Sequence, residues 1–332
     1  MKRPLFVFAG QSNMVGACVY EAPEQVYYEN SFEYLHKPKR FGKEIGDFKN
    51  YGFPCGEFSY KDLIKAYGEG ADGSEKSTLG SYNENAFFGP SVNDLEDDEK
   101  KTCHSFYDFS ESNLKMSTSI APYIIKGLEE NGVYSAFAHI AKGGVPIRYF
   151  LEGDAEKYFY EKAGDFFSDC EKKFSGDDMS EKCFVWLQGE SDNGKGTEYY
   201  LAELRELWSR LKSFGFTKFF MIRVPFWSSV GIVDIMRAQE LFCAENDDVY
   251  MLTRSASFIP WGGLDSSEWL IDVSEEYSMC RDCFYGFGNH HINDKGFRLV
   301  SSYAVANILR IFEGKEPLLE DEKVRLLIEK KI

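Results

Sequence analysis

Five short apolar runs alternate with segments of helical periodicity, and this alternation restricts the fold more than any other feature of the chain. Runs of this length suit strands that are buried on both faces of a sheet. Strands that alternate with helices form a mostly parallel sheet with helices on both sides. We therefore expect an α/β protein with three α/β/α layers and a central parallel sheet of about five strands. The runs expected to form the strands are residues 5–9, 133–141, 183–187, 219–224 and 249–253.

Polar segments directly follow the first three of these runs. They are Gly10-Gln11-Ser12-Asn13, Lys142-Gly143-Gly144 and Gln188-Gly189-Glu190-Ser191-Asp192. The carboxyl ends of parallel strands meet at one edge of a sheet, which is where ligands bind in open α/β folds. We therefore expect the three segments to line one crevice. Ser12 is the candidate nucleophile, although Gly, Ser and Asn are also common turn formers.

Three stretches resemble a known superfamily. They are GQSNM at 10–14, WLQGESD at 186–192 and H-x-x-x-x-G at 291–296. They look like the SGNH hydrolases, and more narrowly like the branch that holds carbohydrate esterase family six and the sialate O-acetylesterases. The resemblance runs in order over roughly residues 4–312, although residues 20–115 carry little of it. It implies a flavodoxin-like SGNH hydrolase fold and a serine esterase without a cofactor. Such an enzyme removes O-acetyl groups from a carbohydrate, such as an acetylated xylo-oligosaccharide or a sialic acid, through an acetyl-enzyme intermediate.

A serine hydroxyl is a weak nucleophile until a neighbouring base takes its proton. The chain has five histidines, of which two lie in an irregular region and His139 lies within a predicted strand, where a structural role is more usual. His290 and His291 precede the last long helical pattern. In the resemblance, the spacing to Gly296 selects His291 as the general base and leaves His290 as the alternative.

An esterase also needs donors for the developing oxyanion. The resemblance assigns this role to the backbone N–H of Ser12, a glycine N–H at Gly143 or Gly144, and the side-chain amide of Gln188. The residues alone allow a plainer interpretation, in which the glycine pair is a tight turn and Gln188 is a buried amide bound by neighbouring loops.

The third member of the triad is where the sequence departs from the family. Many relatives have Asp three residues before the histidine, but that position is Gly288 here. Glu190 is the first choice for the carboxylate because it follows a strand at the same edge of the sheet. Asp282 is the second choice, and a Ser–His dyad without a carboxylate is the third. Asp192 could instead hold its loop through local hydrogen bonds.

Five further residues are candidates for substrate binding. Gln11 and Asn13 flank the candidate nucleophile. Arg148 follows the glycine pair and Arg223 ends a strand, so either could pair with a substrate carboxylate such as that of a sialic acid, or could be structural. Trp227 could stack on a sugar ring or belong to the core.

Other classes of function stay open. Cys280-x-x-Cys283 followed by His290-His291 has ligand types found in zinc sites, but a single CxxC with adjacent histidines is a poor match, so we expect no metal. The missing Asp at position 288 leaves room for a carbohydrate-binding protein without turnover. A lipase or thioesterase on the same scaffold is a further alternative, because a fold does not fix a substrate.

Composition limits the partners. The net charge of −16 argues against nucleic acid, which is bound by clustered Lys and Arg. We expect no membrane partner, because no stretch approaches ~20 apolar residues. The eight cysteines are scattered, as in reduced cytoplasmic proteins, and the first apolar run is too short for a signal peptide. We therefore expect a cytoplasmic enzyme acting on a small or oligosaccharide acetyl ester, of undetermined oligomeric state.

One domain accounts for most of the chain. We expect an esterase domain over residues 1–313 and a C-terminal helical tail over 314–332, separated by Gly314 and Pro317. Residues 20–115 show no sustained period and are rich in aromatic side chains. A long irregular segment of this kind is usually functional or disordered. Its aromatic residues favour an ordered insertion near the active site, with a solvated surface excursion as the alternative.

Overall fold

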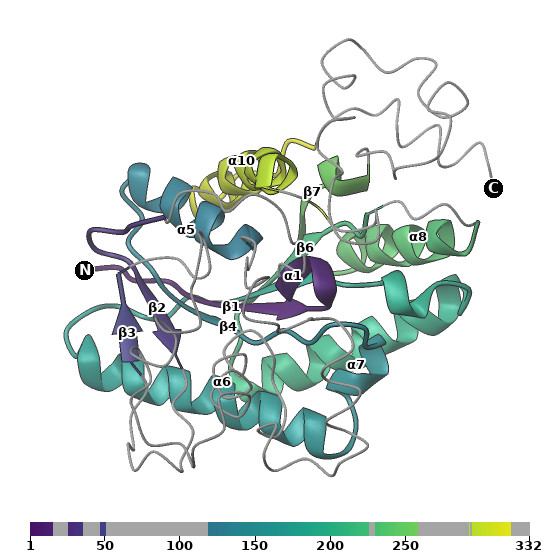
Figure 1. Cartoon of the computed structure of the whole chain (residues 1–332), viewed down its shortest axis with the longest axis horizontal. Coiled ribbons are helices and arrows are strands. Elements are labelled where there is room, and N and C mark those ends of the chain that lie inside the picture. Colours follow the sequence, from purple (N-terminus) through teal and green to yellow (C-terminus); the bar gives the residue numbers. More distant parts are fainter. Residues whose placement is uncertain are drawn as a thin grey trace, which may run out of the picture.

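A computed structural model of the chain describes residues 1–15, 26–35, 47–50, 119–225, 230–257, 292 and 294–319. These residues form a central sheet with helices on both faces (Figure 1). The three-layer, flavodoxin-like architecture expected from the sequence is therefore confirmed. Most of residues 20–115 and all of 320–332 lie outside the described residues. The domain division expected there therefore stays a prediction.

Within the described residues the sheet has seven strands, in the order β3-β2-β4-β1-β5-β6-β7. Six of them are parallel, and β3 pairs with β2 in the antiparallel direction at one edge. The five predicted runs correspond to β1, β4, β5, β6 and β7. The strands are β1 (Leu5–Gly10), β2 (Phe32–Leu35), β3 (Asp47–Lys49), β4 (Ala136–His139), β5 (Lys182–Leu187), β6 (Lys218–Ile222) and β7 (Val249–Thr253).

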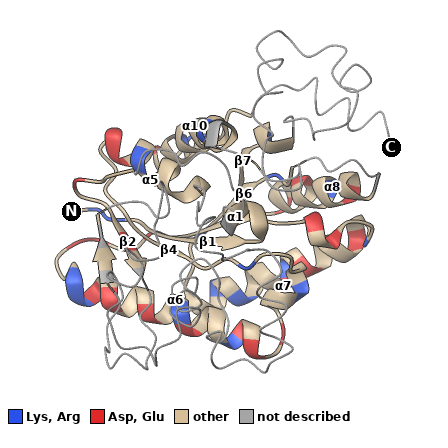
Figure 2. Cartoon of the chain, in the orientation of Figure 1, with Lys and Arg blue, Asp and Glu red and all other residues tan. Residues whose placement is uncertain are grey.

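Alternating side chains of β1 enter two separate cores. Leu5, Val7 and Ala9 pack on one side of the sheet, against α6 (Gly153–Lys173), α7 (Thr197–Phe214) and α8 (Val230–Ala244). Phe6 and Phe8 pack on the other side, against α5 (Ile120–Glu130) and α10 (Asp294–Phe312). Both faces of the strand are thus buried, which explains why the run is apolar without alternation. Figure 2 shows that charged residues lie mainly on the covering helices, while the central strands are largely uncharged.

Strands β2 and β3 add to the five expected strands and fall within the stretch that shows no strand period. The turn before β2 is bound from α5, where the Glu129 carboxylate accepts the backbone N–H groups of Glu29, Asn30 and Ser31 at 3.0, 2.7 and 2.8 Å. The Tyr34 hydroxyl of β2 donates to Asp169 of α6 at 2.8 Å. Contacts with distant helices therefore hold β2, and local sequence does not reveal them.

The order of the strands places a ligand crevice. From β1 the chain passes to β2, β3 and β4 on one side, then to β5, β6 and β7 on the other side. The strand order therefore reverses around β1, and open α/β sheets bind ligands outside the carboxyl ends of the strands at such a switch point. Among the helices that the structure describes, none combines the length and the apolar character needed to span a bilayer.

Candidate active site

The three polar segments predicted from the sequence meet at the carboxyl ends of adjacent strands. Ser12 is the first residue of the short helix α1 (Ser12–Val15), directly after β1. Glu190 begins the 3-10 helix η3 (Glu190–Asp192) after β5, and Gly143 and Gly144 follow β4. Because β1 pairs with both β4 and β5, these segments are neighbours in space. His290, His291, Asp282 and Trp227 lie outside the described residues.

Gly10 allows the end of β1 to approach β5 closely. Its φ is +149°, a value that L side chains rarely adopt, and a Cβ atom built there would lie 2.0 Å from the Leu187 carbonyl oxygen. The next residue, Gln11, donates its backbone N–H to the same carbonyl at 3.2 Å. The Gly10 carbonyl in turn accepts the Lys142 N–H at 3.0 Å. A single glycine thus joins the ends of the three strands just before Ser12.

Gly10→Ala is expected to lower the free energy of unfolding by about 3 kcal/mol, because the backbone of two strands must separate and the new residue has an unfavourable φ. Gly176→Ala is the matched control, since a Cβ there meets open space. Urea unfolding of both variants measures the difference. Equal stabilities of the two variants would contradict this role for Gly10.

Gln188 is the centre of a buried hydrogen-bond network rather than a free amide. Its Nε2 donates to Asp192 Oδ2 at 2.7 Å, to the Val145 carbonyl at 3.1 Å and to Gln11 Oε1 at 3.2 Å. Its Oε1 accepts the Tyr200 hydroxyl at 2.6 Å. These contacts match the plainer interpretation of a buried amide bound by neighbouring loops. Donation to an oxyanion would require Gln188 to give up one of its present acceptors.

Asp192 fixes the loop that carries the glycine pair. Its Oδ2 accepts the Ile147 backbone N–H at 2.8 Å in addition to the Gln188 amide. Burial raises the pKa of Asp192, and the hydrogen bonds from Gln188 and Ile147 oppose this shift. The sequence-based alternative in which Asp192 holds a loop agrees with these bonds. The glycine pair lies between Lys142 and Ile147, whose backbone N–H groups bind Gly10 and Asp192. The N–H groups of Gly143 and Gly144 themselves make no hydrogen bond to another described residue.

Asn13 connects two segments that are far apart in sequence. Its Nδ2 donates to Glu190 Oε1 at 2.7 Å. Its Oδ1 accepts the backbone N–H of Ile292 at 2.9 Å. Ile292 follows His291, the predicted base, and Asn13 follows Ser12, the predicted nucleophile. One buried amide thus joins the turn that begins with Ser12 to Glu190 and to the backbone of Ile292.

The Glu190 carboxyl group is buried, and only one of its two oxygens has a hydrogen-bond partner among the described residues. Burial raises the pKa of Glu190 to about 7, with the hydrogen bond from Asn13 opposing and the charge of Asp192 adding to the shift. Oε1 accepts from Asn13, while Oε2 has no hydrogen-bond partner among the described residues. A buried carboxylate oxygen without a partner is costly, so a donor is expected to face Oε2 when Glu190 is ionised.

His139 has a structural contact next to the site, as expected for a histidine within a strand. It is buried on β4, and its Nε2–H donates to the Met14 carbonyl of α1 at 2.6 Å. Burial lowers the pKa of His139 to about 4, although the bond to Met14 opposes this shift. The neutral ring therefore holds the end of the turn that begins with Ser12.

His139 and Glu190 are expected to give opposite dependences of stability on pH. The unfolded chain protonates His139 below about pH 6.5, but the folded chain resists until about pH 4, so its contribution is lost as the pH falls. Glu190 holds its proton up to about pH 7 when folded and only to about 4.5 when unfolded, so its contribution is lost as the pH rises. Each contribution amounts to about 3 kcal/mol over its window.

Urea unfolding between about pH 4 and about pH 7 should therefore separate two variants from wild type. Relative to wild type, His139→Gln should lose stability toward neutral pH, because the Glu190 term then acts alone. Glu190→Gln should lose stability toward acid pH. Parallel pH profiles for wild type and both variants would be inconsistent with buried, shifted groups at these positions.

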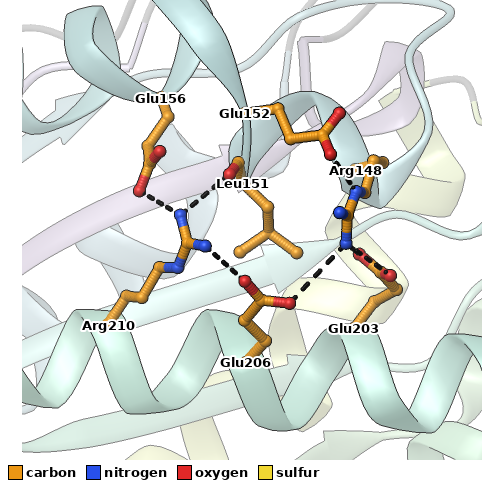
Figure 3. A network of polar contacts seen from close by, with 7 residues as sticks. All are labelled: Arg148, Leu151, Glu152, Glu156, Glu203, Glu206 and Arg210. Atoms are coloured by element: carbon orange, nitrogen blue, oxygen red, sulfur yellow. Dashed lines mark hydrogen bonds and ion pairs between the residues drawn. The ribbon is translucent and has the colours of Figure 1, made fainter.

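The Arg148 guanidinium forms ion pairs with glutamates of the protein (Figure 3). Its guanidinium pairs with Glu152 at 2.6 Å, Glu203 at 2.9 Å and Glu206 at 3.6 Å. Glu206 also pairs with Arg210, which lies further along α7. This network ties the 3-10 helix η2 (Ile147–Phe150), which follows the glycine loop, to α7.

Arg223 is also engaged by the protein. Its side chain is 1% exposed, and it binds Glu240 at 2.9 Å and Ser257 Oγ at 2.8 Å. For Arg148 and Arg223 alike, the structural alternative raised from the sequence fits the contacts. The amides of Gln11 and Asn13 likewise face the loop after β5, where Gln11 Oε1 accepts the Ser191 N–H at 3.1 Å.

Two residues of the network were not predicted. The Tyr200 hydroxyl binds Gln188, and Gln239 Nε2 donates to the Gln188 carbonyl at 2.9 Å. The sequence could have revealed Gln239, because it is a polar residue on the otherwise apolar face of α8. It could not have revealed Tyr200, because a tyrosine near the start of an amphipathic helix is ordinary. Within the described ranges no three His, Cys, Asp or Glu side chains gather as a metal site, and Cys280 and Cys283 lie outside them.

Comparison with known proteins supplies no family assignment. No protein-family model matches the sequence, and no curated protein matches it significantly. The fold resembles NanS (11% identity, TM-score 0.48, 95% of this chain and 98% of that one). It also resembles an Arabidopsis thaliana protein (13%, 0.44, 92% and 98%). A third similar structure is XAC1771, a carbohydrate acetylesterase from Xanthomonas citri (11%, 0.33, 73% and 47%). Similarity at this level assigns no chemistry to the chain. The fold and the site show an α/β protein with a buried polar cluster at the switch point of its sheet.

Proposed function

We propose that this protein is a serine esterase that removes O-acetyl groups from a carbohydrate through an acetyl-enzyme intermediate. The observation that carries the proposal is the pair of hydrogen bonds made by Asn13, to Glu190 Oε1 at 2.7 Å and from Ile292 N at 2.9 Å. A nucleophile, a base and an orienting carboxylate must lie within hydrogen-bond reach of one another. The Asn13 bridge supports such an arrangement for Ser12, His291 and Glu190.

Each member of the proposed triad has a distinct task. Ser12 Oγ attacks the acetyl carbonyl, and His291 takes its proton. Glu190 Oε2, which has no partner among the described residues, accepts the other ring N–H of the histidine and stabilises the imidazolium that forms. His291 then donates its proton to the departing sugar hydroxyl. Water activated by the same histidine hydrolyses the acetyl-enzyme and restores Ser12.

The backbone supplies the proposed oxyanion donors. The N–H of Ser12 and a glycine N–H at Gly143 or Gly144 are the candidates, and the hydrogen bond between Lys142 N and the Gly10 carbonyl keeps the two segments adjacent. Fixed donors of this kind stabilise the tetrahedral intermediate because they need no rearrangement during the reaction. The proposal gives Gln188 a smaller share than the sequence suggested, since its amide already has three protein acceptors.

The contacts of two arginines favour a neutral sugar over a sialic acid as the substrate. A sialic acid carries a carboxylate, for which Arg148 and Arg223 were the proposed partners, but both arginines are paired with glutamates of the protein. They therefore give no support to a sialic acid. We propose a neutral acetylated sugar, such as an acetylated xylo-oligosaccharide, as the better candidate.

Hydrolysis of para-nitrophenyl acetate and butyrate by the full chain tests the proposal, followed by acetate release from acetylated xylo-oligosaccharides and from an O-acetylated sialic acid. We expect turnover that prefers acetate to butyrate and the neutral sugar to the sialic acid. A preference for longer acyl chains would replace the acetylesterase with a lipase or thioesterase. Sugar binding without turnover of any ester would contradict an enzyme.

A further inference from the structure

Asn13 uses both halves of its side-chain amide, and it joins the turn after β1 to two segments that are far apart in the sequence. The side chain is 1% exposed, its Nδ2 donates to Glu190 and its Oδ1 accepts from Ile292. The two partners lie 177 and 279 residues away in the sequence. A buried amide with both groups bonded is fixed in orientation, because rotating it would leave a donor facing the Ile292 N–H.

The first bond determines which carboxylate oxygen of Glu190 remains for another donor. Asn13 occupies Oε1, and Oε2 has no partner among the described residues. Asp192 on the same loop uses its Oδ2 for Gln188 and Ile147. The loop after β5 is thus held at several points, and Oε2 of Glu190 stays available for an incoming N–H.

The second bond determines where the chain enters α10. Ile292 is buried, and its N–H points to an acceptor on the turn that begins with Ser12. A backbone position fixed in this way also limits where the preceding residue, His291, can place its ring. Only a side chain with one donor and one acceptor can serve Glu190 and Ile292 together, so Asp or Leu at this position could keep at most one bond.

We propose that Asn13 is a positioning residue that holds the carboxylate and the base of the triad in register with Ser12, and that it does not bind substrate. The catalytic role of Asn13 rests on the proposed function. Its two hydrogen bonds do not, and they can be tested without any substrate. This role replaces the sequence-based expectation that Asn13 contacts the sugar.

Kinetics of Asn13→Asp test the catalytic part. This variant keeps an acceptor for Ile292 but places a carboxylate against Glu190, which already interacts with Asp192 on η3 and Tyr200 on α7. We expect kcat for para-nitrophenyl acetate to fall about 100-fold, as for other misplaced catalytic groups, with KM unchanged. The acidic limb of the pH profile should move to higher pH, because a like charge disfavours ionisation of Glu190.

The alternatives give different results. A residue that binds the sugar would raise KM for acetylated xylo-oligosaccharides at unchanged kcat, and this outcome would overturn the proposal. A purely structural residue would lower stability without moving the acidic limb, which would also overturn it. Asn131→Asp, at an exposed helix end, is the matched control and should leave kcat, KM and the acidic limb unchanged.

Amide hydrogen exchange at Ile292 tests the structural part without any activity. Exchange should accelerate in Asn13→Ala, which lacks the acceptor, and remain slow in Asn13→Asp, which retains it. Equal protection of Ile292 in wild type and Asn13→Ala would overturn the proposed bond. Because this measurement needs no substrate, failure of the esterase proposal and failure of the positioning proposal can be told apart.

Discussion

Ser12→Ala is expected to lower kcat/KM for para-nitrophenyl acetate by about 10⁴-fold or more, the range found when a serine hydrolase loses its nucleophile. No other described hydroxyl is proposed to attack the ester. The substitution removes a single oxygen from a buried side chain, so unfolding by urea should change little. Activity, and not stability, is therefore the quantity that should collapse.

Ser191→Ala is the matched control for this prediction. Ser191 lies beside Glu190 on the loop after β5, and its backbone N–H is bound by Gln11. Its hydroxyl has no part in the proposed mechanism, so kcat/KM should stay within about twofold of wild type. If Ser191→Ala lost activity and Ser12→Ala kept it, the assignment of the nucleophile would be wrong.

Glu190→Gln is expected to lower kcat by about 10³- to 10⁴-fold while leaving KM nearly unchanged. The new amide can still accept a hydrogen bond from Asn13, but it carries no charge to stabilise an imidazolium. Loss of the carboxylate at otherwise similar geometry has an effect of this size in serine hydrolases. The acidic limb of the pH profile should also change in the variant, because the buried carboxyl group, whose pKa burial raises to about 7, no longer titrates and only the proposed base does.

Glu129→Gln separates catalysis from the general effect of altering a buried carboxylate. Glu129 accepts three backbone N–H groups before β2, away from the proposed site, and these bonds lower its pKa against the opposing effect of burial. This variant should be less stable at neutral pH yet keep its kcat. Unchanged kcat in Glu190→Gln would remove Glu190 from the triad and favour Asp282 or a dyad.

The central strands could be predicted from the sequence because burial on both faces leaves an apolar run that local inspection detects. Strands β2 and β3 could not, since β2 is held by Glu129 and Asp169, which lie about a hundred residues or more further along the chain. The same reasoning placed Ser12 and Glu190 at one edge of the sheet, because the carboxyl ends of parallel strands must meet there.

The roles of individual polar side chains were harder to predict. From the sequence, Arg148 and Arg223 could be ligands for a substrate carboxylate or structural residues, because their partners, Glu203 and Glu240, become neighbours only when helices pack on the sheet. The bridge made by Asn13 joins α1, η3 and the backbone just before α10, which are far apart in the sequence. Local sequence gives residue types at strand ends, whereas the pairing of those residues is a property of the assembled layers.

Mass spectrometry of the enzyme, quenched in acid during turnover of para-nitrophenyl acetate, tests the central claim most directly. An activated ester acylates faster than water removes the acetyl group, so the intermediate of a serine esterase accumulates. We predict one acetyl group on the peptide that contains Ser12, and none on that peptide in Ser12→Ala. Turnover with the acetyl group on a different peptide, or with Ser12 unmodified throughout a burst of product, would contradict the account.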